Sequence, residues 1–184
     1  VVLAEAGVDA AQARDGIASL DVVPGRLERI EAGQPFLAVV DYAHTPGAVA
    51  AMLDDARKLA DPGARLLVVL GCGGDRDRDK RPLMGAAAAD GADRAVGTND
   101  NPRSEDPAAI LAAMQQGVPS SARVLVEQDR ARAIEADVWL ARPGDVLVVA
   151  GKGHEQGQET AGVVAPFDDR VVLRNALDAH LGAA

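Results

Sequence analysis

The sequence predicts an α/β fold, in which a mostly parallel, doubly wound sheet is covered by helices on both faces. Three observations predict this class: short apolar runs rich in valine, stretches with helical spacing, and the regular alternation of the two. The apolar runs are too short for buried helices and fit strands that are buried on both faces. Strands that alternate with helices are typical of a parallel sheet.

The expected strands and helices follow one another along the chain. The expected strands span residues 36–40, 66–70, 94–97, 124–126 and 146–150. The expected helices span residues 46–60, 83–91, 107–117, 130–141 and about 169–181. Thr45 before Pro46, and Asp106 before Pro107, have the pattern of an N-cap followed by proline at the first helical position. These two pairs therefore predict where two of the helices begin.

The first residues do not fit this alternation. Residues 8–20 have helical character without a strand of their own, and Pro24-Gly25 is typical of a turn or hinge. We therefore expect an appendage from a preceding domain over residues 1–21, a hinge over 22–32 and the main domain over 33–184. The chain begins with Val1 rather than methionine, which is expected of a processed chain or an excised piece.

The composition excludes several classes of function. The 184 residues carry a net charge of −9, which repels nucleic acid and anionic lipid. The apolar runs are far shorter than the ~20 residues of a spanning helix, and no secretory signal pattern is present. One cysteine, Cys72, and three histidines provide no disulfide framework and no spacing typical of a structural zinc site. We expect a protein of the reducing cytoplasm, without nucleic-acid or membrane partners.

Polar and glycine-rich motifs follow four of the expected strands at their carboxyl ends. These motifs span residues 41–46, 71–75, 98–103 and 151–155. In an open parallel sheet such loops lie along one edge, and ligands bind in the crevice there. The sequence therefore predicts a binding site at this edge of the sheet.

Single residues in these loops allow more than one interpretation. Asp41 fits hydrogen bonding to ribose hydroxyls and a purely structural role equally well. Arg103 has the planar fork that captures a carboxylate at two points. Lys152 stands between two glycines as in a phosphate loop, but the Walker pattern is not matched. Structural, inert or solvated roles are expected for Tyr42, Cys72, His154, His180 and most charges of residues 76–81.

Five motifs, in their order and spacing, resemble one family. They are VPGRLE at residues 23–28, DYAHTP at 41–46, GCGGDRDRDKRPLMG at 71–85, DNPRSEDP at 100–107 and GKGHEQGQE at 151–159. Together they resemble the C-terminal part of the Mur ligases, and most closely the MurE type, which adds meso-diaminopimelate to UDP-MurNAc-L-Ala-D-Glu. The resemblance extends from Val23 to the end of the chain and implies a Rossmann-like domain.

The resemblance implies an enzyme of peptidoglycan precursor synthesis. Mur ligases are three-domain cytoplasmic enzymes that use ATP and Mg²⁺ to convert a carboxylate into an acyl phosphate, which an amino group then attacks to form an amide. The C-terminal domain brings the amino acid and part of the ATP contacts, and its closure excludes water from the reaction. Residues 1–21 would then be the end of the central, ATP-binding domain. Because the main phosphate and Mg²⁺ sites belong to that central domain, the isolated chain is expected to be inactive.

The family motifs also imply roles for nine residues. Diaminopimelate would be bound by Arg81, Asp100, Asn101, Arg103, Gly151 and Glu155. The nucleotide would be contacted by Arg26 at a phosphate, by Asp41 at the ribose and by His44 nearby. Arg103 would bind the distal carboxylate of diaminopimelate, a group that lysine lacks, and Glu155 would pair with the neighbouring ammonium. No catalytic residue and no metal ligand is expected in this chain.

Two alternatives stay open on the sequence alone. The chain could come from a sibling Mur-type ligase that adds lysine or another amino acid, or it could be a non-catalytic Rossmann-like binding module. Substrate profiling of the full-length enzyme distinguishes a lysine-adding ligase from a diaminopimelate-adding one. The reading frame upstream of Val1 distinguishes a domain of a ligase from a free-standing binding module.

Overall fold

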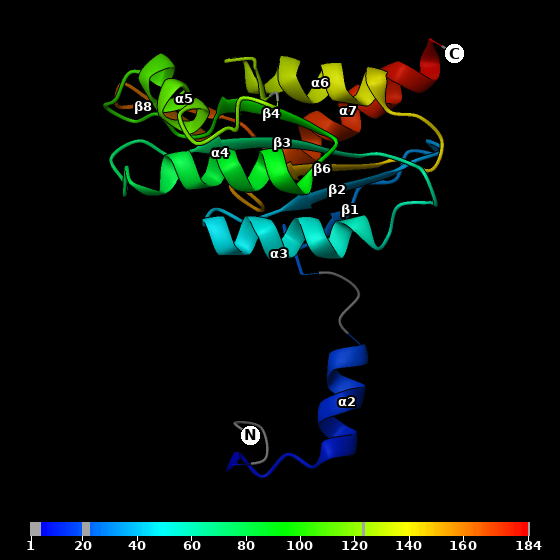
Figure 1. The fold of residues 1–184 in the computed structure, drawn as a ribbon. Coiled ribbons are helices and arrows are strands. Elements are labelled where there is room, and N and C mark those ends of the chain that lie inside the picture. Colours follow the sequence, from blue (N-terminus) through cyan, green and yellow to red (C-terminus); the bar gives the residue numbers. More distant parts are fainter. Residues whose placement is uncertain (1–4, 20–22, 123, 184) are drawn as a thin grey trace.

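The computed structural model describes residues 5–19, 23–122 and 124–183, and its centre is a six-stranded sheet (Figure 1). The strands lie in the order β1-β2-β6-β3-β4-β5. β1 is antiparallel to β2, and every other neighbouring pair is parallel. The strand bounds are β1 (Glu28–Arg29), β2 (Leu37–Asp41), β3 (Leu66–Cys72), β4 (Arg94–Asn99), β5 (Val124–Val126) and β6 (Val146–Ala150). The predicted mostly parallel α/β fold is confirmed.

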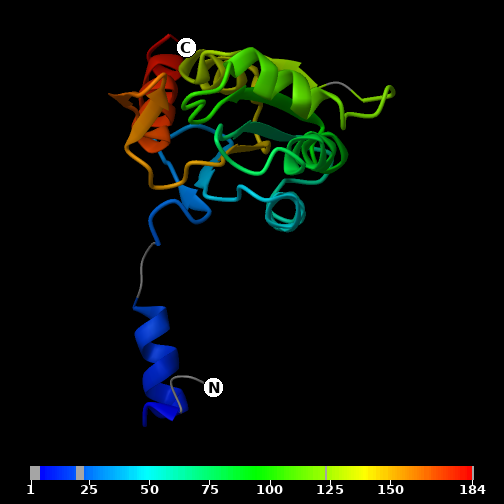
Figure 2. The same cartoon turned by 90° about the vertical axis from the view of Figure 1, so that its left-hand side faces the viewer.

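Helices cover both faces of this sheet (Figures 1 and 2). One face carries α3 (Pro46–Arg57), α4 (Lys80–Gly91) and α5 (Pro107–Gln115), and the other carries α6 (Arg130–Leu140) and α7 (Asp169–Gly182). Successive side chains of a strand point to opposite faces, so β3 contributes to both cores. Val68 packs with the first group of helices and Val69 with the second.

The helix starts follow the predicted caps, with one correction. The hydroxyl of Thr45 accepts a hydrogen bond from the N–H of Ala48 (3.4 Å), and the carboxylate of Asp106 accepts one from Ala108 (3.0 Å). Helix α4 begins at Lys80, three residues earlier than expected. The dense charges before residue 83 resemble a solvated loop in sequence. Arg81, however, is buried and lies within the first turn of the helix.

The sequence analysis did not predict β1 or the antiparallel hairpin of β7 (Gly157–Thr160) and β8 (Val163–Pro166). β1 has only two residues, too few to show a period. All four residues of β8 are exposed, so the hairpin has no alternation of apolar and polar positions. Its turn, Ala161-Gly162, has positive φ at both residues, whereas the usual sequence signal for such a turn is Asn-Gly.

The N-terminal part of the chain contains helix α2 (Ala10–Ala18), which stands apart from the sheet in Figures 1 and 2. Of the range 22–32, expected as a hinge, Glu28 and Arg29 pair with β2 and Ile30 is buried in the core. The expected boundary near residues 20–22 lies outside the described residues. The division of the chain into domains stays a prediction.

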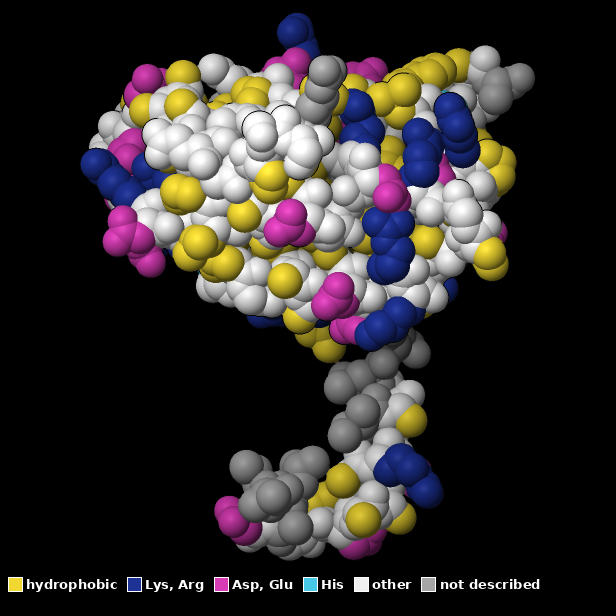
Figure 3. All heavy atoms as spheres, in the orientation of Figure 1, with side chains coloured by type: hydrophobic (Ala, Val, Ile, Leu, Met, Phe, Trp, Pro, Cys, Tyr) yellow, Lys and Arg dark blue, Asp and Glu magenta, His cyan; other side chains and the backbone are white. Residues whose placement is uncertain are grey.

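The surface in Figure 3 shows acidic side chains beside the basic ones, with hydrophobic side chains dispersed between them. A face of this kind lacks the continuous positive charge to which a nucleic-acid backbone binds. None of the described helices is long and apolar enough to cross a membrane.

Candidate functional site

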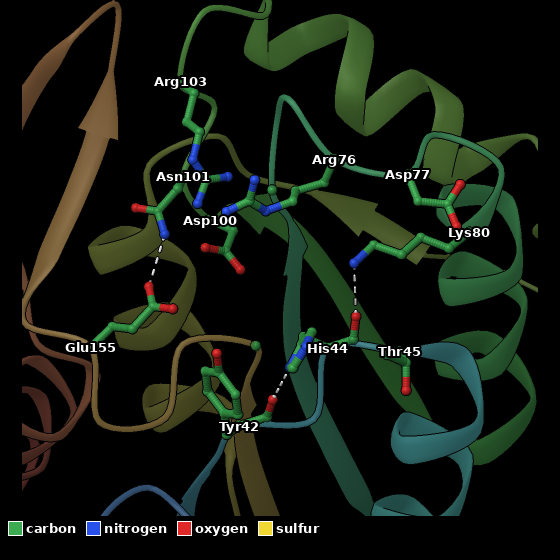
Figure 4. A pocket seen from close by; sticks show the side chains of 12 residues that line it. Tyr42, His44, Thr45, Arg76, Asp77, Lys80, Asp100, Asn101, Arg103 and Glu155 are labelled. Carbon is green, nitrogen blue, oxygen red and sulfur yellow. Dashed lines mark hydrogen bonds between the residues drawn. The ribbon is translucent and has the colours of Figure 1, made fainter.

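A cavity of about 360 Å³ opens at the carboxyl ends of the parallel strands (Figure 4). Its lining comes from the loops that follow β2, β3, β4 and β6, so the predicted convergence of these loops is confirmed. We call it the edge pocket. Its lining residues are Tyr42, His44, Thr45, Gly73, Arg76, Asp77, Lys80, Asp100, Asn101, Arg103, Gly151 and Glu155.

The loop after β4 brings both signs of charge to the edge pocket. Asp100 and Asn101 are buried, and the Asn101 amide nitrogen donates to the Glu155 carboxylate at 2.8 Å. Arg103 has a positive φ of 54°, a conformation that costs on the order of 1–3 kcal/mol for a residue with a side chain. Two backbone hydrogen bonds hold it there: its N–H donates to the carbonyl of Glu159 (3.0 Å), and its carbonyl accepts from Ala161 (2.6 Å). The β7–β8 hairpin thus fixes the backbone of Arg103.

Only some of the N–H groups of the Arg103 guanidinium bind to other parts of the chain. Its Nη1 donates to the carbonyl of Gly74 at 2.7 Å, and its Nε lies 3.4 Å from the carboxylate of Glu159. Gly74 permits this approach, because a Cβ there would meet the carbonyl oxygen of Pro102 at 1.9 Å. The remaining N–H groups leave Arg103 able to bind an anion in the edge pocket.

The loop after β6 contributes Gly151, Lys152 and Glu155. Gly151 has φ of +113°, which favours glycine, and a Cβ there would lie 3.1 Å from the Asp100 carboxylate. The ammonium of Lys152 is fully buried, 3.1 Å from Asn101 Oδ1 and 3.2 Å from Glu155 Oε2. Glu155 therefore carries its charge beside a buried cation and faces the edge pocket.

The residues expected at the nucleotide lie at the end of β2. Both carboxylate oxygens of Asp41 accept backbone hydrogen bonds, from Leu27 (2.8 Å) and from Ala43 (2.7 Å). The guanidinium of Arg26 lies 4.7 Å from the ring centre of Tyr42. His44 Nδ1 donates to the carbonyl of Tyr42 at 2.8 Å, because a carbonyl can only accept. This bond leaves His44 Nε2 available on the exposed side.

Among the residues expected to bind diaminopimelate, Arg81 is the one that does not line the edge pocket, and of the residues expected at the nucleotide only His44 lines it. Its two terminal nitrogens donate to the two carboxylate oxygens of Glu105 at 3.1 and 2.8 Å. These bonds are the main reason why the pKa of Glu105 falls from 4.5 to about 2. A third contact joins Arg81 to the carbonyl of Gly73 at 3.4 Å. Arg81 supports the loop after β3 from beneath and lies apart from Asp100, Asn101, Arg103, Gly151 and Glu155, which line the pocket together.

Sequence reasoning missed several lining or supporting residues. Arg76 and Lys80 line the edge pocket, although their charged run resembles a solvated loop. Tyr42 also lines it, with its ring 4.5 Å from His44 and 5.5 Å from His154. Lys152 follows the end of β6 closely, which places it at the edge where the loops converge. The burial of Lys152, however, depends on partners that are distant in sequence, such as Asn101.

The remaining candidates lie elsewhere. Cys72 is buried, and loss of solvation raises its pKa to about 12, so the thiol is unreactive at neutral pH. His180, expected on the surface, is only partly exposed and packs edge-on against Trp139. Within the part of the chain that the structure describes, His, Cys, Asp and Glu form no group of three that could hold a metal ion.

Comparisons with known proteins show the family of this chain. A family model described as "Mur ligase, glutamate ligase domain" matches residues 25–153. The chain is 60% identical to the UDP-N-acetylmuramoyl-L-alanyl-D-glutamate–2,6-diaminopimelate ligase of Streptomyces avermitilis, over 99% of this chain and 37% of that protein. It is 54% identical to the ligase of the same name from Corynebacterium glutamicum, over 97% of this chain and 35% of that protein.

Solved structures give the same result. A structure of a UDP-N-acetylmuramoyl-L-alanyl-D-glutamate–2,6-diaminopimelate ligase superimposes with a TM-score of 0.80 at 45% identity, covering 98% of this chain and 37% of that one. The MurF ligase of Thermotoga maritima in complex with ADP has a TM-score of 0.57 at 18% identity over 99% of this chain and 36% of its own, which shows a shared fold only. The chain spans little more than a third of the length of these relatives. It belongs to the Mur ligase family and carries that family's glutamate ligase domain.

Proposed function

We propose that this chain is the amino-acid-binding domain of an ATP-dependent ligase that joins meso-diaminopimelate to UDP-MurNAc-L-Ala-D-Glu in peptidoglycan precursor synthesis. Residues 1–21 would be the end of the preceding ATP-binding domain and residues 22–32 a hinge, whose residues 28–30 pack on the domain of residues 33–184. The 60% identity to a ligase of this name supports the assignment. The resemblance to the Mur ligases implies the cytoplasm as the location of this enzyme.

The observation that carries the proposal is the pairing of opposite charges in the edge pocket. Arg103 and the amide of Asn101 present N–H donors, while Glu155 and Asp100 present carboxylates. An amino acid bears a carboxylate beside an ammonium, so this arrangement matches one zwitterionic end of the ligand. Diaminopimelate has two such ends. One can be held in the edge pocket while the other presents its amino group to the reacting carbonyl.

The same geometry disfavours lysine as the substrate. Lysine lacks the distal carboxylate, so its binding would bury donors of Arg103 and Asn101 without an acceptor. A buried donor left unpaired costs about 1–3 kcal/mol, and more where it is charged. Sites built to hydrogen-bond a substrate group discriminate strongly against analogues that lack it.

The residues at the end of β2 fit part of an ATP site. Arg26 lies next to the Tyr42 ring, and the ammonium of Lys80 donates to the carbonyl of His44 at 3.0 Å, so two cations lie beside the loop that follows β2. In the full ligase, ATP supplies the phosphoryl group that activates the acceptor carboxylate. Arg26 would contact a phosphate, Asp41 would contact the ribose and His44 would lie near the nucleotide. We assign Mg²⁺ to the central domain, as the resemblance to the Mur ligases implies.

The test begins with the reading frame upstream of Val1. We expect the frame to continue and to encode a G-x-x-G-K-[ST] phosphate loop. The encoded ligase should release ADP in the presence of UDP-MurNAc-L-Ala-D-Glu and meso-diaminopimelate, and should do so poorly with lysine. A stop codon and start site directly before Val1 would favour a free-standing binding module. A preference for lysine would favour the sibling ligase.

A further inference from the structure

Lys152 is a buried cation that the proposed function leaves without a role. Its side chain has no exposed surface, although Gly151 before it and Glu155 after it both line the edge pocket. The ammonium lies 3.1 Å from Asn101 Oδ1, 3.2 Å from Glu155 Oε2 and 3.7 Å from Asp100 Oδ1. A buried ammonium is strongly unfavourable unless it is paired. All three of its partners line the edge pocket.

These contacts fix the orientation of the Asn101 amide. Its Oδ1 accepts from the Lys152 ammonium and also from the backbone N–H of Glu159 at 2.9 Å. A carbonyl oxygen has two lone pairs, and both are therefore used. The amide nitrogen must face the opposite way, toward Glu155, as Figure 4 shows. Asn101 can therefore offer a ligand only hydrogen-bond donors.

Lys152 fixes Glu155 in the same manner. Glu155 Oε2 accepts both from Lys152 and from the amide nitrogen of Asn101. The other carboxylate oxygen turns toward the middle of the edge pocket in Figure 4. Without the cation, the partly exposed Glu155 and the buried Asp100 would be two neighbouring carboxylates without a positive partner between them, and each would repel the other. Only the backbone N–H of Glu159 would then hold the oxygen of the Asn101 amide in this orientation.

We propose that Lys152 is a positioning residue that sets the hydrogen-bonding polarity of the edge pocket. It makes Asn101 a donor, for the carboxylate of the amino acid, and Glu155 an acceptor, for the ammonium. This inference rests on the proposed function, because it assigns a zwitterionic amino acid to the pocket. Lys152 itself touches neither the ligand nor the reacting atoms.

The first experiment replaces the cation with a neutral side chain of similar length in the full ligase. Lys152→Met should raise the KM for meso-diaminopimelate by about tenfold or more, since a misoriented amide and two repelling carboxylates weaken binding. The KM for ATP and the kcat should change less than about twofold. Lys58→Met is the matched control, because Lys58 is exposed and pairs only with Asp55. This control should leave all three constants unchanged.

A double-mutant cycle separates positioning from general loss of structure. If Lys152 acts through Asn101, then Lys152→Met should add less than about threefold to the KM of an Asn101→Ala variant. Effects on KM that multiply independently would overturn the proposal, as would an unchanged amino-acid KM in a folded Lys152→Met ligase. Failure of the wild-type ligase to use meso-diaminopimelate at all would instead overturn the proposed function.

A spectroscopic measurement on the unaltered chain covers the case in which Lys152 variants do not fold. The sequence has only three lysines, Lys58, Lys80 and Lys152, so their ammonium signals are easily distinguished by nitrogen-15 NMR. The Lys152 ammonium protons should exchange with water at least about tenfold more slowly than those of Lys58. Asn101→Ala should abolish most of that difference. Equal exchange at both lysines in the wild type would overturn the proposal.

Discussion

The guanidinium of Arg130 lies directly against the carboxylate of Asp169, and neither side chain is exposed to solvent. The two hydrogen bonds between them measure 2.8 and 2.7 Å. Arg130 also donates to the carbonyls of Ala150 (2.9 Å) and Asn99 (3.4 Å), the last residues of β6 and β4. A single pair of side chains thus ties the start of α7 to the strand ends from which the edge pocket loops emerge.

Loss of one charge from this pair should destabilise the whole domain. Asp169→Asn leaves the guanidinium of Arg130 buried without its counter-ion, which costs about 3–5 kcal/mol. Urea unfolding at neutral pH measures the effect. Asp178→Asn, on an exposed position of the same helix, should change stability by less than about 0.5 kcal/mol. Equal stability of Asp169→Asn and the wild type would mean that the pair does not hold these elements together.

Removal of the Arg103 side chain should weaken amino-acid binding selectively. In the full ligase, we expect Arg103→Ala to raise the KM for meso-diaminopimelate by roughly a hundredfold, corresponding to about 3 kcal/mol for a charged hydrogen-bonding fork. The KM for ATP should change little, because Arg26 and His44 lie at a different loop. Steady-state kinetics with each substrate varied in turn decides the matter. Equal effects on both constants would remove the assigned role.

A methyl group at residue 74 should displace the loop that carries Arg103. In Gly74→Ala the new Cβ would meet the carbonyl oxygen of Pro102, a backbone atom that cannot turn aside. We expect a loss of about 1–3 kcal/mol in stability, together with a raised amino-acid KM. Gly47→Ala is the matched control, because a Cβ at this exposed helical position meets nothing within 4 Å. The control should be stabilised by roughly 0.5–1 kcal/mol.

Acid should weaken the contact between Arg81 and Glu105 over a defined range of pH. The hydrogen bonds from Arg81 lower the pKa of Glu105 to about 2 from an ordinary value of 4.5. The carboxylate therefore contributes stability that is fully present above pH 4.5 and is lost as the pH falls toward 2. Glu105→Gln should be less stable than the wild type at pH 7, with a difference that narrows below pH 4.5.

The measurement for Glu105 is urea unfolding at pH 7 and again near pH 3. Glu135→Gln, at an exposed position of α6, serves as the control and should show the same difference from the wild type at both values. If the loss of stability in Glu105→Gln were the same at both pH values, ionisation of Glu105 would contribute nothing to the stability of the fold.

The 184-residue chain alone should show no ATP hydrolysis. The sequence has no phosphate loop of the Walker pattern, and the resemblance to the Mur ligases implies that the main phosphate and Mg²⁺ sites lie in the central domain. Release of phosphate from ATP by the purified chain, compared with the full ligase, is the measurement. Turnover by the chain at a rate near that of the ligase would contradict its assignment as an amino-acid-binding domain.

Much of the fold was predictable, because its signals are local. Valine-rich runs of three to five residues between helical stretches indicate buried strands, and the caps at Thr45 and Asp106 mark where two helices begin. The placement of loop motifs after strands also predicted that Arg103 and Glu155 would share one pocket, which the structure confirms. The hairpin of β7 and β8 escaped prediction because its exposed residues have no apolar period.

By itself, the sequence determined the order of the five parallel strands and their helices, the edge at which the loops gather and the family to which the chain belongs. The tertiary structure alone decided which charged side chains face that edge. Arg81 turns to Glu105, 24 residues away, and Lys152 is buried against Asn101, 51 residues away. The physical reason is that the environment of a charge depends on groups brought near it by folding. A local pattern records the residues of a loop, whereas the partners that bury or neutralise them come from other strands of the sheet.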